Sequence, residues 1–418
     1  MRIYCIGIGG IGLSALARYY VHAGHTVYGS DISDSPLIHT LQGEGVHIAI
    51  GEDASRITAD IDMVVHTIAI SETNPEFVQA KNLGILCKTY PEALGDITRE
   101  KTTIAICGTH GKTTTTAMTY NAFLACGIKP TVIVGSLLFG VGTNFIPGDS
   151  EYLIVEACEY KRSFLHLTPK HVIITNIDAD HLDYYKDIED IRSAFQEFVE
   201  HLPQDGYLVT HSNVNLLTTG KKMDADCVDR ESIELSVLGE HNQSNAQLVI
   251  ALGNALGLPE DKVREGLLAF RGTWRRLEYK GVTERGVMVY DDYGHHPTEI
   301  QATLDALKKK YPTHKLYVFF QPHLFSRTKL FLDSFAEVLA AAHHVYCMPI
   351  YAAREALDET ISSDTLVNVI RSRGGSAELL MSKDMMPGVI DSLDEKQSIA
   401  VNIGAGDAYV ELDKLSLQ

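Results

Sequence analysis

Apolar and polar positions at the start of the chain predict a strand, a helix and a second strand in succession. Residues from Arg2 to Ile8 are apolar and β-favouring, and after a glycine cluster the stretch from Leu13 to Ala23 reads as a helix. We therefore expect residues 1–97 to form one doubly wound, Rossmann-like α/β domain. The other strands predicted here are Thr26 to Gly29, Met63 to Thr67 and Ile85 to Cys87.

The same succession starts again after residue 97. A strand from Thr103 to Cys107 runs into a second glycine loop, and a helix is predicted from Thr113 to Cys126. We expect residues 98–272 to form a central P-loop ATPase-type α/β domain. Its other predicted elements are strands Tyr152 to Glu156, Val172 to Thr175 and Tyr207 to Thr210, and helices Ile188 to His201 and Asn242 to Leu256.

A third alternation of strands and helices follows Trp274-Arg275-Arg276, so residues 273–418 are expected to form a Rossmann-like C-terminal domain. The chain is thus predicted to be an α/β protein of three domains, with sites at the domain junctions. Its predicted elements are strands Val287 to Tyr290, Leu316 to Phe320 and Val345 to Pro349, and helices Ile300 to Tyr311 and Thr328 to His343.

Composition narrows the possible partners. The 418 residues carry a formal net charge of -18, which disfavours generic binding to nucleic acid or anionic membranes. Seven scattered cysteines without a C-x-x-C pair indicate reduced core thiols. Since Met1 to Gly7 reads as a strand and no apolar run reaches 18 residues, we expect a cytoplasmic protein, either a monomer or a weak dimer.

The strongest motif lies between the strand and the helix that open the second domain. Backbone N–H groups and a helix N-terminus can wrap phosphates there, Lys112 can neutralise them, and the Thr113 hydroxyl can bind a phosphate-bound Mg²⁺. Ile106 replaces the first glycine of the common pattern, so this is a variant loop, and a chance glycine turn is the alternative. The candidate ATP-binding residues are Gly108, Thr109, His110, Gly111, Lys112, Thr113 and Thr114.

Acidic groups follow the next two predicted strands. Glu156 ends one strand, and the segment Asp178-x-Asp180-His181-x-Asp183 follows another. Carboxylate oxygens with one imidazole suit Mg²⁺ better than zinc. Taken alone, the second segment also fits a solvated acidic loop.

Near the N-terminus, Gly7-x-Gly9-Gly10-x-Gly12 follows a strand and opens a helix, with Asp31 further along. This fingerprint indicates close approach of a diphosphate, and it does not choose between NAD, FAD and a UDP-sugar.

A dense polar cluster, Asp291 to Glu299, joins a strand to a helix in the third domain, with His323 and Arg327 after the next strand. An arginine can clamp a carboxylate, and histidine or aspartate can take a proton from an amine. Helix capping by Asp292 or Thr298 beside solvated histidines is the alternative. Gly404 to Asp407 forms another loop where a backbone can approach closely.

Together these segments resemble the Mur ligase family over nearly the whole chain, and most closely its alanine-adding branch. The resemblance implies an ATP- and Mg²⁺-dependent ligase that joins L-alanine to the lactyl carboxylate of UDP-N-acetylmuramate through an acyl phosphate, in peptidoglycan synthesis. The segments that carry it are Gly7 to Gly12, Gly108 to Thr116, Glu156 to Glu159, Asn176 to His181, His241 to Ala246, Arg275-Arg276, Asp291 to Glu299, Gln321 to His323 and Gly404 to Asp407.

The resemblance also implies a role for each candidate residue. It places the UDP-sugar on Gly9, Gly10, Ile11, Gly12, Ser30 and Asp31. It places ATP on the phosphate loop with Asn242, Asn245, Arg276 and Asp292, and Mg²⁺ on Thr113, Glu156 and His181. It places the amino acid on His295, His296, His323 and Arg327. The catalytic set is Lys112, Glu156, His181, Asp292 and Arg276.

Two positions depart from relatives. Leu324 stands where some carry an arginine, and Gln196 stands where relatives that add other amino acids have a carbamylated lysine that bridges a second Mg²⁺. A sibling ligase that attaches the recycled L-Ala-γ-D-Glu-diaminopimelate tripeptide is the nearest alternative. A nicotinamide dehydrogenase would leave Lys112 and Glu156 without a role, and a non-catalytic UDP-sugar-binding protein would not need them.

Overall fold

The computed structural model describes residues 1–136, 142–182, 184–353, 355–393 and 397–418. Contacts divide the chain into two compact units. The first comprises residues 1–236 and 243–271, and the second comprises residues 237–242 and 272–418. The first unit holds two sheets and the second unit holds one, which gives the three-domain α/β fold expected from the sequence. The boundaries after residues 97 and 272 stay predictions.

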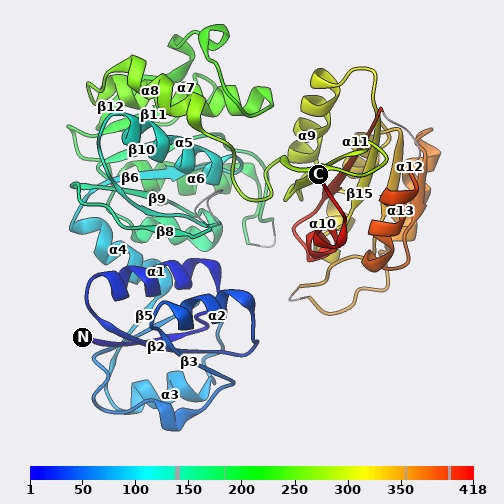
Figure 1. Cartoon of the computed structure of the whole chain (residues 1–418). Coiled ribbons are helices and arrows are strands. Elements are labelled where there is room, and N and C mark those ends of the chain that lie inside the picture. The colour runs from blue at the N-terminus through cyan, green and yellow to red at the C-terminus, as the bar shows by residue number, and fades with distance from the viewer. Residues whose placement is uncertain (137–141, 183, 354, 394–396) are drawn as a thin grey trace. The chain divides into compact units, whose positions relative to one another are not determined.

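The first sheet has five parallel strands in the order β3-β2-β1-β4-β5. Alternate residues of β1 point to opposite faces, so Ile3 packs with Leu16 of α1 while Tyr4 packs with Phe77 of α3. Figure 1 shows these two helices on opposite sides of the sheet. The strands are β1 Arg2–Ile6, β2 Thr26–Asp31, β3 His47–Ile50, β4 Met63–His66 and β5 Leu86–Thr89. The helices are α1 Ile11–His22, α2 Pro36–Gly43, α3 Pro75–Asn82 and α4 Tyr90–Arg99.

The second sheet has the order β12-β11-β10-β6-β9-β7-β8, with only β8 antiparallel among its described pairs. Helices α5 and α7 cover one face with Phe123 and Leu248, and α6 covers the other with Phe195. The strands are β6 Thr102–Cys107, β7 Thr131–Ile133, β8 Phe145–Ile146, β9 Tyr152–Glu156, β10 His171–Ile174, β11 Tyr207–Thr210 and β12 Lys221–Asp224. The helices are α5 Lys112–Ala125, α6 Ile188–Val199, α7 Glu240–Ala255 and α8 Glu260–Ala269.

A buried polar group joins the first two sheets. The side-chain amide of Asn144, which is fully buried, donates to the Ile11 carbonyl oxygen and to Ser14 Oγ at 2.8 Å, and its oxygen accepts from Arg18. Arg18 also donates to Glu44 at 2.7 Å. The start of α1, which follows the N-terminal glycine loop, is therefore fixed to the strand β8 side of the central domain.

We expect Asn144→Ala to lower the free energy of unfolding by about 1–3 kcal/mol, because it leaves buried hydrogen-bonding groups of Arg18 and Ser14 without their partner. Urea denaturation measures this loss. Asn254→Ala, in an exposed part of α7 where the amide donates to the exposed Glu260, is the matched control and should change little. Equal stability of the two variants would contradict a structural role for Asn144.

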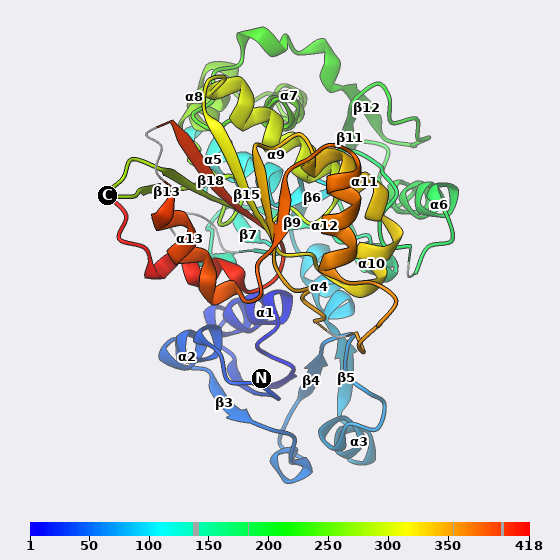
Figure 2. The same ribbon diagram turned by 90° about the vertical axis from the view of Figure 1, so that its right-hand side faces the viewer.

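The sheet of the second unit has the order β13-β14-β18-β15-β16-β17, with β13 antiparallel to β14. In the turned view of Figure 2, α11 and α12 lie on one side of this sheet and α13 on the other. The strands are β13 Glu278–Val282, β14 Met288–Asp292, β15 Lys315–Phe320, β16 His344–Cys347, β17 Ala377–Leu379 and β18 Ser398–Ile403. The helices are α9 Pro297–Lys310, α10 Phe325–Leu330, α11 Leu332–Leu339, α12 Ser363–Ser372 and α13 Met386–Ser392.

One predicted helix is divided in the structure. The continuous helix predicted from Thr328 to His343 is two helices, α10 and α11, because Phe331 leaves helical geometry with φ of -104° and ψ of 18°. The second helix ends at Leu339, and His344 already begins β16. None of the helices in the described ranges is long and apolar enough to cross a membrane.

Candidate active site

The phosphate loop lies where the sequence predicts it, between β6 and α5. Gly108 and Gly111 have φ of 132° and 82°, values that favour glycine. A Cβ on Gly108 would lie 2.0 Å from Thr175 Oγ1, and one on Gly111 would lie 2.9 Å from Asn245 Oδ1. The N–H of His110 donates to Asn176 Oδ1 at 2.9 Å. The loop is therefore held tightly by β10 and its following residues, with α5 starting directly after it.

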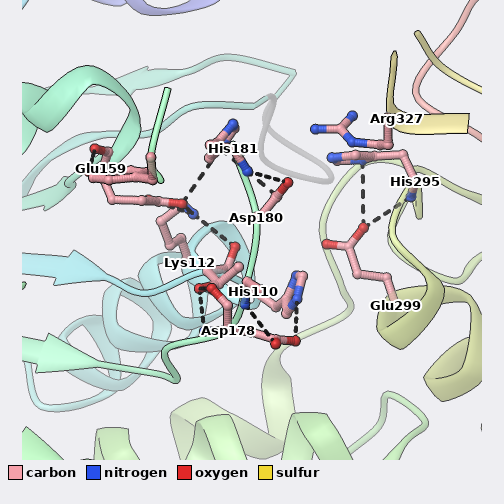
Figure 3. Close-up of polar contacts among 12 residues, drawn as sticks. His110, Lys112, Glu159, Asp178, Asp180, His181, His295, Glu299 and Arg327 are labelled. Atoms are coloured by element: carbon pink, nitrogen blue, oxygen red, sulfur yellow. Dashed lines mark hydrogen bonds and ion pairs between the residues drawn. The ribbon is translucent and has the colours of Figure 1, made fainter. Parts of the chain in front are cut away.

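Lys112, the first residue of α5, is held inside this loop. Its Nζ donates to the carbonyl oxygens of Gly108 and Thr109 at 2.5 and 3.0 Å and lies 2.9 Å from the Glu159 carboxylate (Figure 3). Burial lowers the pKa of Lys112, but the charges of Glu159 and Glu156 outweigh it and the pKa is raised overall. The side chain is therefore a cation at neutral pH, ready to pair with a phosphate.

Glu159 was not among the candidate residues. Its side chain is only 3% exposed, and it faces both Lys112 and His181, whose Nε2 lies 3.7 Å from Glu159 Oε1. The signal in the sequence is its spacing, three residues after Glu156 at the end of β9. A buried carboxylate beside a lysine and a histidine is the kind of coupled group found at catalytic sites.

Hard oxygen atoms gather beside the loop. Glu156 ends β9, and its carboxylate accepts from Thr113 Oγ1 at 2.9 Å and from the Gly135 N–H at 3.0 Å. A side chain at Gly135 would lie 2.9 Å from Glu156 Oε1. Two of the three predicted Mg²⁺ ligands, Thr113 and Glu156, are thus already in contact, and their oxygen chemistry fits Mg²⁺.

His181, the third predicted ligand, lies on the loop after β10. Its φ is 54°, a strained value for a residue with a side chain, and Asp180 Oδ1 supports it by accepting from its N–H at 2.7 Å. The ring packs on Tyr160 with centroids 4.7 Å apart. Asp178 is tied to the phosphate loop, since its N–H donates to Thr109 Oγ1 at 2.8 Å. Asp183 lies outside the described residues.

The N-terminal glycine loop is braced by one of its predicted partners. The Asp31 carboxylate accepts from the N–H of Gly9 at 2.9 Å and from that of Ser33 at 3.1 Å. Gly10 is the N-cap of α1, which begins at Ile11. Ser30 is 2% exposed and donates to the buried Glu76, so its side chain belongs to the interior of the sheet. Contacts of these residues with a UDP-sugar stay predictions.

Asn242 and Asn245 lie in the first turns of α7. Asn245 is 5% exposed, with its amide beside Gly111 of the phosphate loop, whereas Asn242 donates to the Leu238 carbonyl oxygen at 2.5 Å. The Gln196 side-chain amide forms two hydrogen bonds of 2.9 Å with the backbone of Leu217, and its Nε2 also donates to Glu200 at 3.4 Å. These contacts give Gln196 a structural role.

In the second unit, Arg276 and Asp292 lie at the start of the loop of residues 293–296, between β14 and α9. Arg276 is 3.4 Å from Glu299 and lies over the Tyr293 ring. Asp292 accepts from the N–H groups of Leu277 and Gly294, both at 2.7 Å. Burial raises the pKa of Asp292 to about 6, although Arg276 and the two N–H groups act in the opposite direction.

This raised pKa predicts a pH dependence. Between about pH 4 and 6 the folded state holds more protons at Asp292 than the unfolded state, so stability falls as pH rises through this window, by up to about 3 kcal/mol. Asp292→Asn should remove this component while losing one accepted hydrogen bond at all pH values. Unfolding free energies at pH 4.5 and 7.5 test it, and parallel pH profiles for variant and wild type would contradict it.

All four predicted amino-acid-binding residues belong to the second unit, and three of them, His295, His323 and Arg327, lie close to one another. The rings of His295 and His323 lie 6.1 Å apart, and Arg327 of α10 is 3.3 Å from His323 Nδ1. His295 contacts Glu299 (Figure 3). His296 instead caps α9 by accepting from the Thr298 N–H at 3.3 Å, and its ring packs on Phe331. Leu324, just before α10, has φ of 69° and is buried.

Comparison with known proteins relates this chain to one family. Three family models match the chain: "Mur ligase family, catalytic domain" over residues 2–102, "Mur ligase middle domain" over 106–228, and "Mur ligase, glutamate ligase domain" over 275–406. The UDP-N-acetylmuramate–L-alanine ligase of Agathobacter rectalis is 40% identical, with 97% of this chain and 96% of the relative covered. That of Clostridium beijerinckii is 39% identical, covering 99% and 97%.

Among solved structures, the UDP-N-acetylmuramate-alanine ligase of Thermotoga maritima superposes with a TM-score of 0.83 at 28% identity, covering 99% of this chain and 98% of that one. A murein peptide ligase of Psychrobacter arcticus shares the fold with a TM-score of 0.72 at 23% identity, covering 99% and 98%. Because the family models span most of the chain and a relative of 40% identity matches it nearly end to end, this chain belongs to the Mur ligase family.

Proposed function

We propose that this protein is the ligase that uses ATP to join L-alanine to the lactyl carboxylate of UDP-N-acetylmuramate, in peptidoglycan precursor synthesis. The names of the full-length relatives at about 40% identity support this substrate pair. One observation of the structure carries the chemistry: Thr113, in the first turn of α5, lies 2.9 Å from Glu156 at the carboxyl end of β9, beside the largely buried ammonium of Lys112. We place the reaction in the cytoplasm.

In the first step, the lactyl carboxylate attacks the γ-phosphorus of ATP, and the γ-phosphate passes to the carboxylate as an acyl phosphate while ADP leaves. The loop N–H groups and Lys112 would hold the phosphates and neutralise the charge that spreads over them. Thr113, Glu156 and His181 would hold Mg²⁺, which when bound supplies further positive charge at the phosphates. Asn245 beside the loop, with Asn242, would face the adenine, and Arg276 and Asp292 would complete the ATP site.

In the second step, the amine of L-alanine attacks the acyl carbon and phosphate leaves, forming the amide bond. An α-amino group has a pKa of about 8, so it must lose a proton before it attacks at neutral pH. His181, Asp292 or a histidine of the 295–323 cluster would accept that proton. Arg327, with His323 beside it, would hold the alanine carboxylate, because Leu324 offers no second cation.

Phosphate release from ATP and Mg²⁺ with UDP-N-acetylmuramate tests this proposal, when L-alanine, other amino acids and the L-Ala-γ-D-Glu-diaminopimelate tripeptide are compared. We expect release that depends on L-alanine, with a product heavier than the nucleotide by one alanyl residue. Release that depends on the tripeptide would support ligase activity but identify the tripeptide, not L-alanine, as the amine substrate. No release with any amine would contradict ligase activity and favour a UDP-sugar-binding protein.

A further inference from the structure

Tyr90, the first residue of α4, lies where the first sheet is joined to the central domain. Its backbone is fixed by a capping box, in which Thr89 and Glu92 bond each other's backbone N–H groups, and by Pro91 in the first turn. No feature of the sequence had marked this tyrosine. Its ring packs against the core shared by the two sheets, and the residue as a whole is half-buried.

The far end of the Tyr90 ring lies against Gly12 of the N-terminal glycine loop. A Cβ on Gly12 would be 2.8 Å from Tyr90 Cζ, closer than a Cβ packs, and 3.1 Å from each Cε atom. The last glycine of this fingerprint is usually required for close packing of the helix. Here the group that needs this space is the hydroxyl-bearing end of Tyr90.

The charge state of the Tyr90 phenol decides which groups it can bind. Burial raises its pKa, and the neighbouring Cys158 and Glu156, at the end of β9, raise it further. The phenol therefore keeps its proton and can act only as a neutral donor toward an anion. Among the residues that the structure describes, no hydrogen bond from the Tyr90 hydroxyl to another side chain or to the backbone is formed.

We propose that the Tyr90 hydroxyl donates a hydrogen bond to the diphosphate of the sugar nucleotide held over the glycine loop. The inference rests on the proposed function, which places that diphosphate on residues Gly9 to Gly12. Tyr90 then binds the sugar nucleotide from the side of the loop on which its ring lies against Gly12. This adds a side-chain donor to the backbone N–H groups of the glycine loop, in a chain whose net charge of -18 disfavours anions.

Tyr90→Phe is the test, since it removes the hydroxyl and keeps the ring that packs on Gly12. We expect the dissociation constants of both UDP and UDP-N-acetylmuramate to rise roughly tenfold or more, as for other hydrogen bonds to charged groups. Binding is measured by titration calorimetry with no turnover. Binding of uridine, which lacks the diphosphate, and of a non-hydrolysable ATP analogue should stay unchanged, as should the melting temperature.

Tyr19→Phe is the matched control, because Tyr19 is a half-buried tyrosine of α1 that packs on Phe145 away from the glycine loop. It should bind all four probes as the wild type does. Unchanged UDP affinity in Tyr90→Phe would overturn the inference, as would a loss confined to UDP-N-acetylmuramate, which would place the contact on the sugar. A wild-type protein that fails to bind UDP would instead overturn the proposed function.

Discussion

Replacing Lys112 with alanine is expected to lower kcat for alanine-dependent phosphate release by about a thousandfold or more, the loss seen when a preorganised charge at a transition state is removed. The ammonium is already held by two loop carbonyl oxygens and by Glu159, so it needs little reorganisation to meet the phosphates. Steady-state kinetics at saturating ATP measure the effect, and a decrease below tenfold would contradict the proposed role.

The buried ion pair with Glu159 requires a control for folding. Lys112→Ala leaves the Glu159 carboxylate buried without its main partner, which destabilises a protein by several kcal/mol in comparable cases, about 3–5 kcal/mol. The double variant Lys112→Met with Glu159→Gln removes both charges and should recover much of that stability while remaining inactive. Lys170→Ala, which removes a lysine paired with the exposed Asp205 at the opposite end of β10, should keep full activity.

The sequence predicted those helices and strands whose apolar pattern and boundary residues lie within the segment itself. The strand, glycine loop and helix around Gly108 were predicted nearly to the residue, because the apolar run, the glycines and the helix start are all in the local sequence. Helix α4 was missed although Thr89-Tyr90-Pro91-Glu92 contains a capping box and a proline at the first turn, a readable start signal. The short strands β7 and β8 have too few residues for any periodicity to show.

The sequence predicts which loops form the candidate site. It predicts less well which way individual side chains point. Thr113 and Glu156 lie in contact because the phosphate loop and Glu156 come at the ends of the neighbouring parallel strands β6 and β9, and their binding of Mg²⁺ stays a prediction. Glu159 was missed because its contact with Lys112 depends on how the loop after β9 folds back. Ser30 and His296 were predicted to bind ligands from their residue type. In the structure Ser30 donates to the buried Glu76 and His296 accepts from the N–H of Thr298 at the start of α9, contacts that depend on tertiary packing.

Arg275→Ala should produce the largest loss of stability in the second unit, about 3–5 kcal/mol, because it breaks a buried ion pair from one side. Arg275 is 1% exposed, and its guanidinium lies 2.9 Å from Asp291 and donates to the carbonyl oxygens of Gly404 and Gly406. Its planar group also lies over the rings of Tyr409 and Tyr293, at 4.3 and 5.2 Å. One side chain therefore joins the linker before β13 to both loops at the ends of β14 and β18.

Hydrogen exchange of the β14 and β18 amides measures this loss of stability. The pH dependence of the loss distinguishes the contribution of the ion pair from that of the packing around Arg275. Burial already raises the pKa of Asp291, with Arg275 and Asn402 opposing it, so removing Arg275 raises that pKa further. The loss should then be smaller at pH 5 than at pH 7.5, since a protonated Asp291 no longer needs the cation. Arg275→Met with Asp291→Asn should recover part of the stability, and Arg373→Ala, on an exposed pair with Asp333, should change little. A pH-independent loss in Arg275→Ala would assign the effect to the aromatic packing and to the two loop carbonyl groups.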